Sequence, residues 1–163
     1  MNNEVQRIRE FLFENYVRII NIFYYYSGCS AYPMITMNDF TSFARATNIL
    51  DYEVIGLAAL DLILVATCTS HHQYVNSATL DMTRYEFMEM IVRVANERFK
   101  NTRIVKTTCE ALERVLETMI YPNARSMDGE HFRRYHCYNI KVNEILKKNE
   151  SQIQKLYDSF THA

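Results

Sequence analysis

The sequence has few residues that form tight turns and none of the largest aromatic type. It contains three glycines, two prolines and no tryptophan in 163 residues. Hairpin turns depend on glycine, proline and similar residues, so their scarcity favours helices over a sheet-rich fold. The composition is 48% hydrophobic and 23% charged, which is typical of a folded chain and excludes wholesale disorder. The sequence therefore predicts one domain, or two small lobes that share a core.

The chain also lacks a strong charge and a long apolar run. The formal net charge is -1, which provides no basic field for a polyanion and makes nucleic-acid binding unlikely. The most apolar run, residues 55–66, is shorter than the ~20 residues of a membrane span and contains Asp61. We expect no membrane partner. Residues 52–67 are instead predicted to form a core helix that is covered on more than one side.

The cysteines form no closely spaced pair of the Cys-x-x-Cys type. Cys29, Cys68, Cys109 and Cys137 could form two disulfides, but the first residues of the chain are polar and do not resemble a signal peptide. We therefore expect reduced, mostly buried thiols in an intracellular, cytoplasmic protein.

No motif of a catalytic or cofactor site is present. The sequence has no glycine-rich phosphate loop, no nucleophile elbow and no His-Glu-x-x-His run, so we predict no catalytic residues and no enzyme activity. The neighbours His71 and His72 do not converge on one ion without further ligands and are expected to be polar loop residues. We expect no cofactor and no metal.

Helical periodicity is the main feature that is present. In residues 82–99 an apolar stripe recurs at steps of three and four. Its members are Phe87, Ile91, Val94, Ala95 and Phe99. Charged residues occupy the opposite face, where they support one another at a spacing of four. Further helices are predicted over residues 3–26, 39–50, 52–67, 106–120 and 138–160. The predicted fold class is all-α.

A six-residue pattern occurs twice, each time at the start of a predicted helix. Both copies read aliphatic residue, threonine, two variable residues, acid and phenylalanine. The matching anchor residues are Ile35, Asp39 and Phe40 in the first copy and Met82, Glu86 and Phe87 in the second. An acid at this place is also explained by capping, because the side chain of Asn38 or Asp39 can satisfy free amides of the first helical turn.

The pattern resembles the second half of an EF-hand loop and the first turn of its exit helix. In that superfamily the aliphatic residue stands at loop position 8 and the acid at position 12, and positions 1, 3 and 5 supply oxygen ligands for calcium. Here positions 1, 3 and 5 hold Gly28, Ser30 and Tyr32 in the first loop. They hold Val75, Ser77 and Thr79 in the second loop. The resemblance thus implies degenerate, calmodulin-like hands that have lost their calcium ligands.

The resemblance implies a bundle of paired helix-loop-helix units over residues 1–100, followed by a helical part over residues 101–163 with a long C-terminal helix. Phe132 follows Phe87 by nearly the interval that separates Phe87 from Phe40, so a third degenerate hand is suspected at residues 127–132. For function, the resemblance implies a calcium-independent structural or adaptor subunit. Such a subunit would bind other proteins through an amphipathic helix or a helix groove. The expected setting is a larger cytoskeletal assembly, with a cilium or flagellum as the first candidate.

Two stretches are the candidate partner-binding residues. The predicted C-terminal helix carries a heptad-like seam that contains Leu146, Asn149, Ile153, Leu156 and Phe160. This seam could lie on the chain's own core, but the polar residue within it favours docking on a partner. Tyr24 and Tyr25 belong to an aromatic run that is either packed under the first loop or a stacking surface. As an alternative function, Arg133 and Arg134 could serve a helical regulatory or nucleic-acid-binding module.

Overall fold

The computed structural model confirms an all-α fold and describes residues 2–29, 32–51, 53–69 and 81–161. Its contacts divide the chain into two compact units, residues 1–127 and 128–163. This division falls after the predicted boundary at residue 100, since the helix at residues 108–115 packs against two helices that precede residue 100. None of the described helices has the length and apolar character needed to cross a bilayer.

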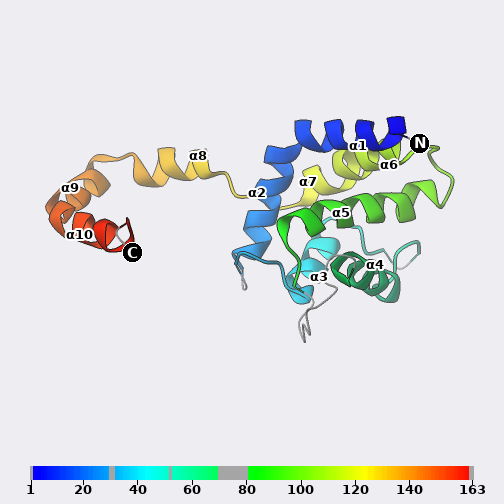
Figure 1. Ribbon diagram of the computed structural model, residues 1–163, viewed down its shortest axis with the longest axis horizontal. Helices are drawn as coiled ribbons and strands as arrows, with labels where there is room; N and C mark the ends of the chain where they lie inside the picture. The colour runs from blue at the N-terminus through cyan, green and yellow to red at the C-terminus, as the bar shows by residue number, and fades with distance from the viewer. Residues whose placement is uncertain (1, 30–31, 52, 70–80, 162–163) are drawn as a thin grey trace. The chain divides into compact units, whose positions relative to one another are not determined.

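The described residues of the first unit form seven α-helices and two π-helical turns. Figure 1 shows how these helices are arranged. They are α1 (Asn2–Glu14), α2 (Tyr16–Ser27), α3 (Met37–Ala46), α4 (Leu57–Thr69), α5 (Arg84–Ala95), a π-helical turn (Asn96–Lys100), α6 (Thr108–Val115), a second π-helical turn (Leu116–Ile120) and α7 (Tyr121–Asn123). Helix α5 lies at the centre of the unit, in contact with α2, α4 and α6, while α1 covers α6.

The single helix predicted over residues 3–26 is two helices, because Asn15 interrupts it. Asn15 has a φ of -94° and a ψ of 1°, and its side-chain amide donates to the Phe11 carbonyl at 2.9 Å. Asparagine side chains compete in this way with the hydrogen bonds of the helix. The Tyr121 hydroxyl donates to Asn15 Oδ1 at 2.8 Å, so a residue far along the sequence holds the break.

The core is centred on aromatic rings from α2, α3 and α5. The Phe87 ring centroid lies 5.7 Å from that of Phe23 and 5.2 Å from that of Phe43, and all three side chains are fully buried. Tyr26 meets Phe43 edge-on at 5.2 Å, and Phe40 stacks on Phe43 at 6.0 Å. Both phenylalanines of the repeated pattern therefore belong to one cluster.

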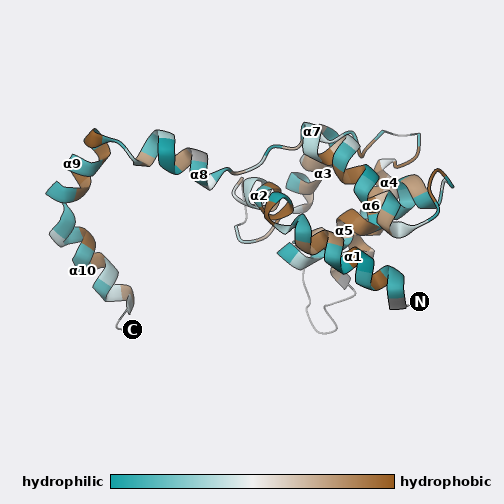
Figure 2. Ribbon diagram, turned by 90° about the horizontal axis from the view of Figure 1, so that it is seen from above, coloured by the Kyte–Doolittle hydropathy of each residue, from teal (hydrophilic) through white to brown (hydrophobic). Residues whose placement is uncertain are grey.

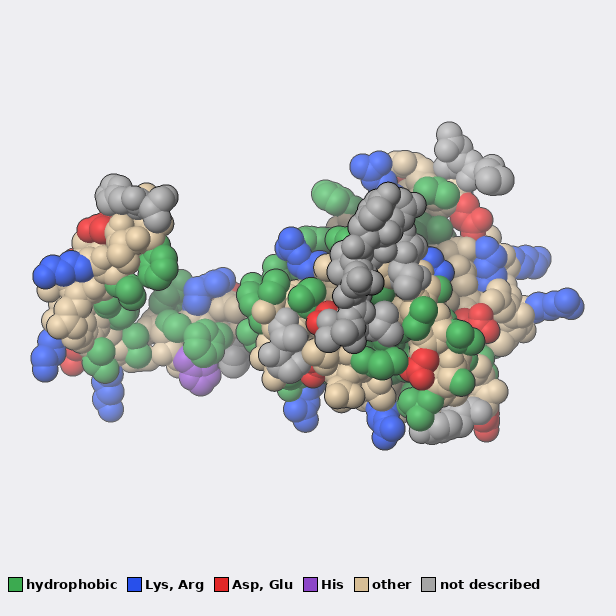
Figure 3. Space-filling view, turned by 60° about the horizontal axis from the view of Figure 1, so that its bottom comes forward, with side chains coloured by type: hydrophobic (Ala, Val, Ile, Leu, Met, Phe, Trp, Pro, Cys, Tyr) green, Lys and Arg blue, Asp and Glu red, His purple; other side chains and the backbone are tan. Residues whose placement is uncertain are grey.

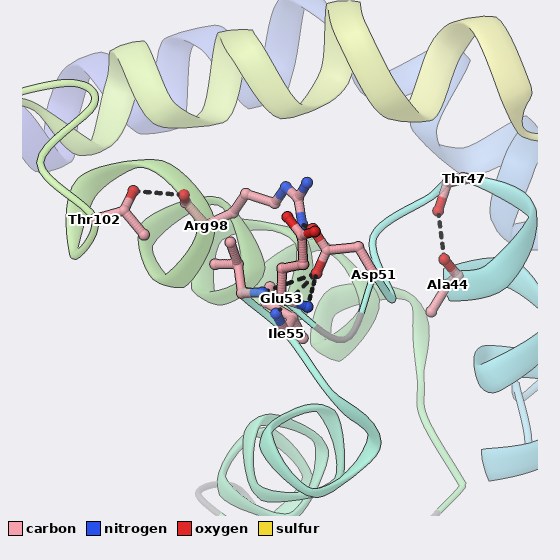
Figure 4. Close-up of polar contacts among 8 residues, drawn as sticks. Ala44, Thr47, Asp51, Glu53, Ile55, Arg98 and Thr102 are labelled. Atoms are coloured by element: carbon pink, nitrogen blue, oxygen red, sulfur yellow. Dashed lines mark hydrogen bonds and ion pairs between the residues drawn. The ribbon is translucent and has the colours of Figure 1, made fainter.

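A carboxylate fixes the turn that leads into α4. Asp51 accepts hydrogen bonds from the backbone N–H groups of Glu53, Val54 and Ile55 and pairs with the Arg98 guanidinium (Figure 4). Burial alone would raise the pKa of Asp51, but these hydrogen bonds and the positive charge outweigh it and lower the pKa to about 2. The ion pair ties the connection between α3 and α4 to the π-helical turn that follows α5.

Helix α4 is not covered on several sides, in contrast to the prediction from its composition. Leu60, Leu64 and Cys68 are buried, whereas Leu62 is 71% exposed and Val65 is 39% exposed. The reason is that α4 packs against α5 through one face. An apolar helix can be recognised from sequence, but the number of neighbours that cover it cannot.

The cysteines are all free thiols, and they differ in burial from the prediction. Only Cys68 is buried, Cys29 is exposed, and Cys109 and Cys137 are intermediate. Burial raises the pKa of the Cys68 thiol to about 11, which makes it a poor nucleophile.

The second unit is built from short helices. They are α8 (Gly129–Phe132), a π-helical turn (Arg133–Cys137), α9 (Ile140–Lys148) and α10 (Glu150–Thr161). The long helix predicted over residues 138–160 is broken at Asn149, whose side-chain amide donates to the Ile145 carbonyl at 2.8 Å. None of the described side chains from residue 128 to 161 is buried, so these side chains form no core.

Candidate functional site

The two copies of the repeated pattern meet through their equivalent aliphatic residues. The Ile35 N–H donates to the Met82 carbonyl at 2.9 Å, and the Met82 N–H donates to the Ile35 carbonyl at 2.8 Å. Both side chains are fully buried. The two copies therefore meet in an antiparallel bridge between equivalent residues.

The acids of the pattern are both held by the threonine three residues before them. Thr36 Oγ1 donates to Asp39 Oδ2 at 2.6 Å, and the Asp39 N–H donates back to Thr36 Oγ1 at 3.2 Å. In the second copy the Thr83 hydroxyl and backbone N–H donate to Glu86 Oε2 at 2.6 and 2.8 Å. These are capping interactions at the N-termini of α3 and α5. The cap residue of α3 is Thr36 rather than the predicted Asn38 or Asp39.

The loop positions that carry calcium ligands in EF-hands are described only in part. Gly28 caps the C-terminus of α2, and Tyr32 is exposed. Ser30, Val75, Ser77 and Thr79 lie outside the described residues, as do His71 and His72. Over the described ranges, no three histidine, cysteine or acidic side chains gather in a way that could hold a metal.

Tyr24 and Tyr25 were predicted together, but they have different surroundings. The Tyr25 hydroxyl accepts a hydrogen bond from Arg125 at 3.0 Å, and its ring meets Tyr26 edge-on at 5.2 Å. Tyr25 thus fastens the segment after α7 to α2. Tyr24 instead lines a cleft of about 450 Å³ beside the contact between Ile35 and Met82.

Apart from Tyr24, the residues of the cleft are not among the predicted site residues. Its walls are Phe23, Tyr24, Tyr32, Pro33, Met34, Thr83, Arg84 and Tyr85. Residues 32–34 precede Ile35 directly, and residues 83–85 follow Met82 directly. The antiparallel bridge between Ile35 and Met82 brings these two segments close to each other.

The C-terminal candidates form an exposed apolar surface on α9 and α10. Leu146, Ile153, Leu156 and Phe160 are all exposed, and Phe160 is 77% exposed. Asn149 is half-buried at the corner between the helices. Figure 2 shows hydrophobic residues recurring along both helices, and Figure 3 shows hydrophobic side chains at the surface. Three further apolar residues of these helices, which were not predicted as site residues, are also exposed: Ile140, Ile145 and Tyr157.

A hollow lies in the angle between α9 and α10. It has a volume of about 290 Å³ and is lined by Leu146, Lys147, Glu150, Ile153 and Gln154. Leu146 from α9 and Ile153 from α10 supply its apolar walls, while three polar side chains form the rest. The break at Asn149 therefore turns the predicted straight seam into a bent surface.

The arginines of the alternative site share one carboxylate. Arg133 Nη2 lies 3.0 Å and Arg134 Nε lies 2.9 Å from Glu130, and hydrogen bonds from these two side chains lower the pKa of Glu130. This pairing offsets part of their positive charge. Phe132, which the suspected third hand requires as an anchor, is exposed, unlike Phe40 and Phe87.

The chain was compared with known protein families, curated proteins and solved structures. No protein-family model matches the chain, and neither the curated proteins nor the solved structures give a significant match.

Proposed function

We propose that this chain is a calcium-independent, EF-hand-like helical adaptor that binds another protein through α9 and α10. The observation that carries the proposal is the apolar surface of the second unit, whose described side chains include none that is buried. Units below about 40 residues rarely fold on their own core. The unit spans 36 residues, from Asp128 to Ala163.

The lengths of the helices support this reading. Helix α9 has 9 residues and α10 has 12, and isolated helices shorter than about 12–15 residues are marginal in water. Their stability therefore depends on a surface that covers Leu146, Ile153, Leu156 and Phe160. An amphipathic helix that lies in the groove of another protein is a common solution.

Calcium independence is supported by the acids of the repeat and by the loop sequences. Asp39 and Glu86 are each engaged by a threonine within a helix cap. Positions 1, 3 and 5 of both loops lack carboxylates, which calcium sites of this type require. The Ile35 and Met82 backbones hold the two copies together by two hydrogen bonds.

Titration calorimetry tests calcium independence. We expect no saturable heat when the intact chain is titrated with millimolar calcium, and no change in its helical circular dichroism. A dissociation constant in the micromolar range would show that ligands outside the two caps complete a calcium site, and would contradict this part of the proposal.

Partner binding is tested with a face-specific pair of variants. The tagged chain is recovered from its native source in high salt, and the attached protein is identified and measured. Leu156→Glu with Phe160→Glu should abolish recovery of that protein, because charges on the apolar surface cannot be desolvated. The matched control, Gln152→Glu with Ser159→Glu, changes exposed polar residues of the same helix and should preserve recovery. Equal recovery with both pairs would contradict docking through α10.

The structural features above support protein binding. The expected cytoskeletal assembly rests on the resemblance to EF-hand proteins alone. A cytoskeletal or ciliary setting would follow from the identity of the recovered partner. The shared pairing of Arg133 and Arg134 with Glu130 gives no support to the nucleic-acid alternative.

A further inference from the structure

We propose that the cleft beside the Ile35–Met82 contact is a second, separate recognition site. Its occupant is a peptide segment of a partner protein that presents an aromatic side chain next to a carboxylate. The cleft is formed by residues 23–24, 32–34 and 83–85, and it shares no residue with α9 or α10. The proposal therefore goes beyond docking through the C-terminal helices, and either can fail without the other.

The position of the cleft follows from the pairing of the two repeats. Ile35 and Met82 exchange both backbone hydrogen bonds in an antiparallel bridge. Tyr32 stands three residues before Ile35, and Tyr85 stands three residues after Met82. In an antiparallel pair these two positions correspond, and Tyr32, before the first repeat, and Tyr85, within the second, both line the cleft. Both rings retain exposed surface, Tyr32 at 68% and Tyr85 at 49%.

Helix α2 supplies the remaining aromatic wall. The Phe23 ring is fully buried, and the Tyr24 ring meets it edge-on at 6.0 Å between centroids. Phe23 thereby anchors Tyr24 against the core. Pro33 and Met34 add apolar surface to the wall of the cleft. Tyrosines around a buried phenylalanine are well suited to hold a flat ring, because each has few rotatable bonds and loses little conformational entropy on binding.

Arg84 gives the cleft its charge preference. Its Nη1 atom donates to the Tyr24 hydroxyl at 3.4 Å, which places the guanidinium beside the aromatic wall. Among the described residues, no carboxylate pairs with Arg84. The nearest acid in sequence, Glu86, is fully buried and bonded to Thr83, and it does not line the cleft. A ligand carboxylate would therefore meet a cation that has retained its hydrogen-bonding capacity.

The residue types and the size of the cleft agree with a peptide anchor. Tyrosine and arginine are enriched among the residues that dominate the energy of protein interfaces. A cleft of about 450 Å³ has room for one aromatic side chain and an adjoining carboxylate. The ligand ring would contact the tyrosines, and its neighbouring carboxylate would pair with Arg84.

Blocked pentapeptides provide the test. The probe has the sequence Ala-Glu-Phe-Ala-Ala, and it is compared with peptides that carry Gln or Lys in place of Glu, or Ala in place of Phe. Binding to the intact chain is followed by NMR of the tyrosine rings and of the arginine Nε–H groups. We expect the Glu-Phe peptide to shift the signals of Tyr24, Tyr85 and Arg84 and to bind with millimolar affinity. The Gln and Lys peptides should bind more weakly, and the Ala peptide should not bind.

Two variants separate recognition from folding. Arg84→Gln should weaken the binding of the Glu-Phe peptide about threefold to tenfold, the effect of losing one exposed charged contact. The variant should no longer prefer the Glu-Phe peptide over the Gln peptide. Arg9→Gln, at an exposed position on α1, is the matched control and should bind like the wild type. Thermal unfolding checks that both variants are folded. Equal binding of the Glu, Gln and Lys peptides, or shifts confined to residues outside the cleft, would overturn the proposal.

Discussion

Helices α5 and α10 have the same length and a similar amphipathic pattern, yet they occupy opposite environments. Each has 12 residues. In α5 the apolar stripe is buried among three neighbouring helices, and Phe87 has 0% exposure. In α10 no residue is buried, and Phe160 has 77% exposure. An amphipathic pattern thus shows that a face must be covered, but not which molecule covers it.

The ion pairs of the two units show the same contrast. Asp51 and Arg98 are only 23% and 18% exposed, and Asp51 also accepts three backbone hydrogen bonds. Glu130 and its arginine partners are at least half exposed. Solvent screens the second cluster and leaves it little influence on stability. Removing a carboxylate should therefore lower the free energy of unfolding more in the first unit than in the second.

Replacing one phenylalanine in each unit should produce the largest difference. Phe87→Ala removes a ring from the centre of the aromatic cluster and should lower the free energy of unfolding by about 3–5 kcal/mol. Phe160→Ala, the matched control, should change it by less than about 0.5 kcal/mol, because the ring is exposed. Urea unfolding monitored by circular dichroism measures both. A loss below about 1 kcal/mol for Phe87→Ala would place that ring outside the energetic core.

The second-largest difference should be between the contributions of Asp51 and Glu130 to the free energy of unfolding. Asp51 has a folded-state pKa of about 2, below its ordinary value of 3.8. A depressed pKa means that the charged carboxylate stabilises the fold, by about 2 kcal/mol above pH ~4. This contribution disappears as the pH falls through the folded-state pKa. Asp51→Asn should therefore be destabilised at neutral pH and should lose that part of the pH dependence.

Glu130→Gln is the control for this comparison. Its carboxylate is exposed, so its loss should leave the free energy of unfolding unchanged. Unfolding curves of wild type and both variants, recorded at intervals from pH 7 to pH 2, separate the two effects. Identical pH profiles for wild type and Asp51→Asn would contradict the role assigned to the ion pair with Arg98.

The sequence predicted the helical class, and it located the two repeat anchors. Ile35 and Met82 were selected because they occupy the same place in a pattern, and the structure joins them by two backbone hydrogen bonds. Patterns of this kind are readable because they reflect local capping and periodic burial. The cleft beside them was not predicted, because its two sides come from segments about fifty residues apart that only the antiparallel bridge brings together.

The ends of the helices, and the extent to which neighbouring helices bury them, were predicted less well. Asn15 and Asn149 each interrupt a predicted helix, and in both cases the side-chain amide donates to the carbonyl four residues earlier. Asparagine is tolerated inside many helices, so sequence alone does not reveal such a break. Leu62 on α4 shows the second limit. Its apolar surroundings in the sequence predicted burial, but its side chain is 71% exposed.

Removing the second unit should have the smallest effect on the stability of the first. A chain that ends at Met127 retains the aromatic cluster, the Ile35–Met82 contact and the bond from Arg125 to Tyr25. Its main unfolding transition should shift by less than about 1 kcal/mol, since none of the removed residues that the structure describes is buried. Thermal unfolding and partner recovery are measured beside the intact chain. The truncated chain should fold and should fail to recover the partner. Global unfolding would show that the helices belong to the chain's own core, and undiminished recovery by a folded truncation would remove α9 and α10 from the binding surface.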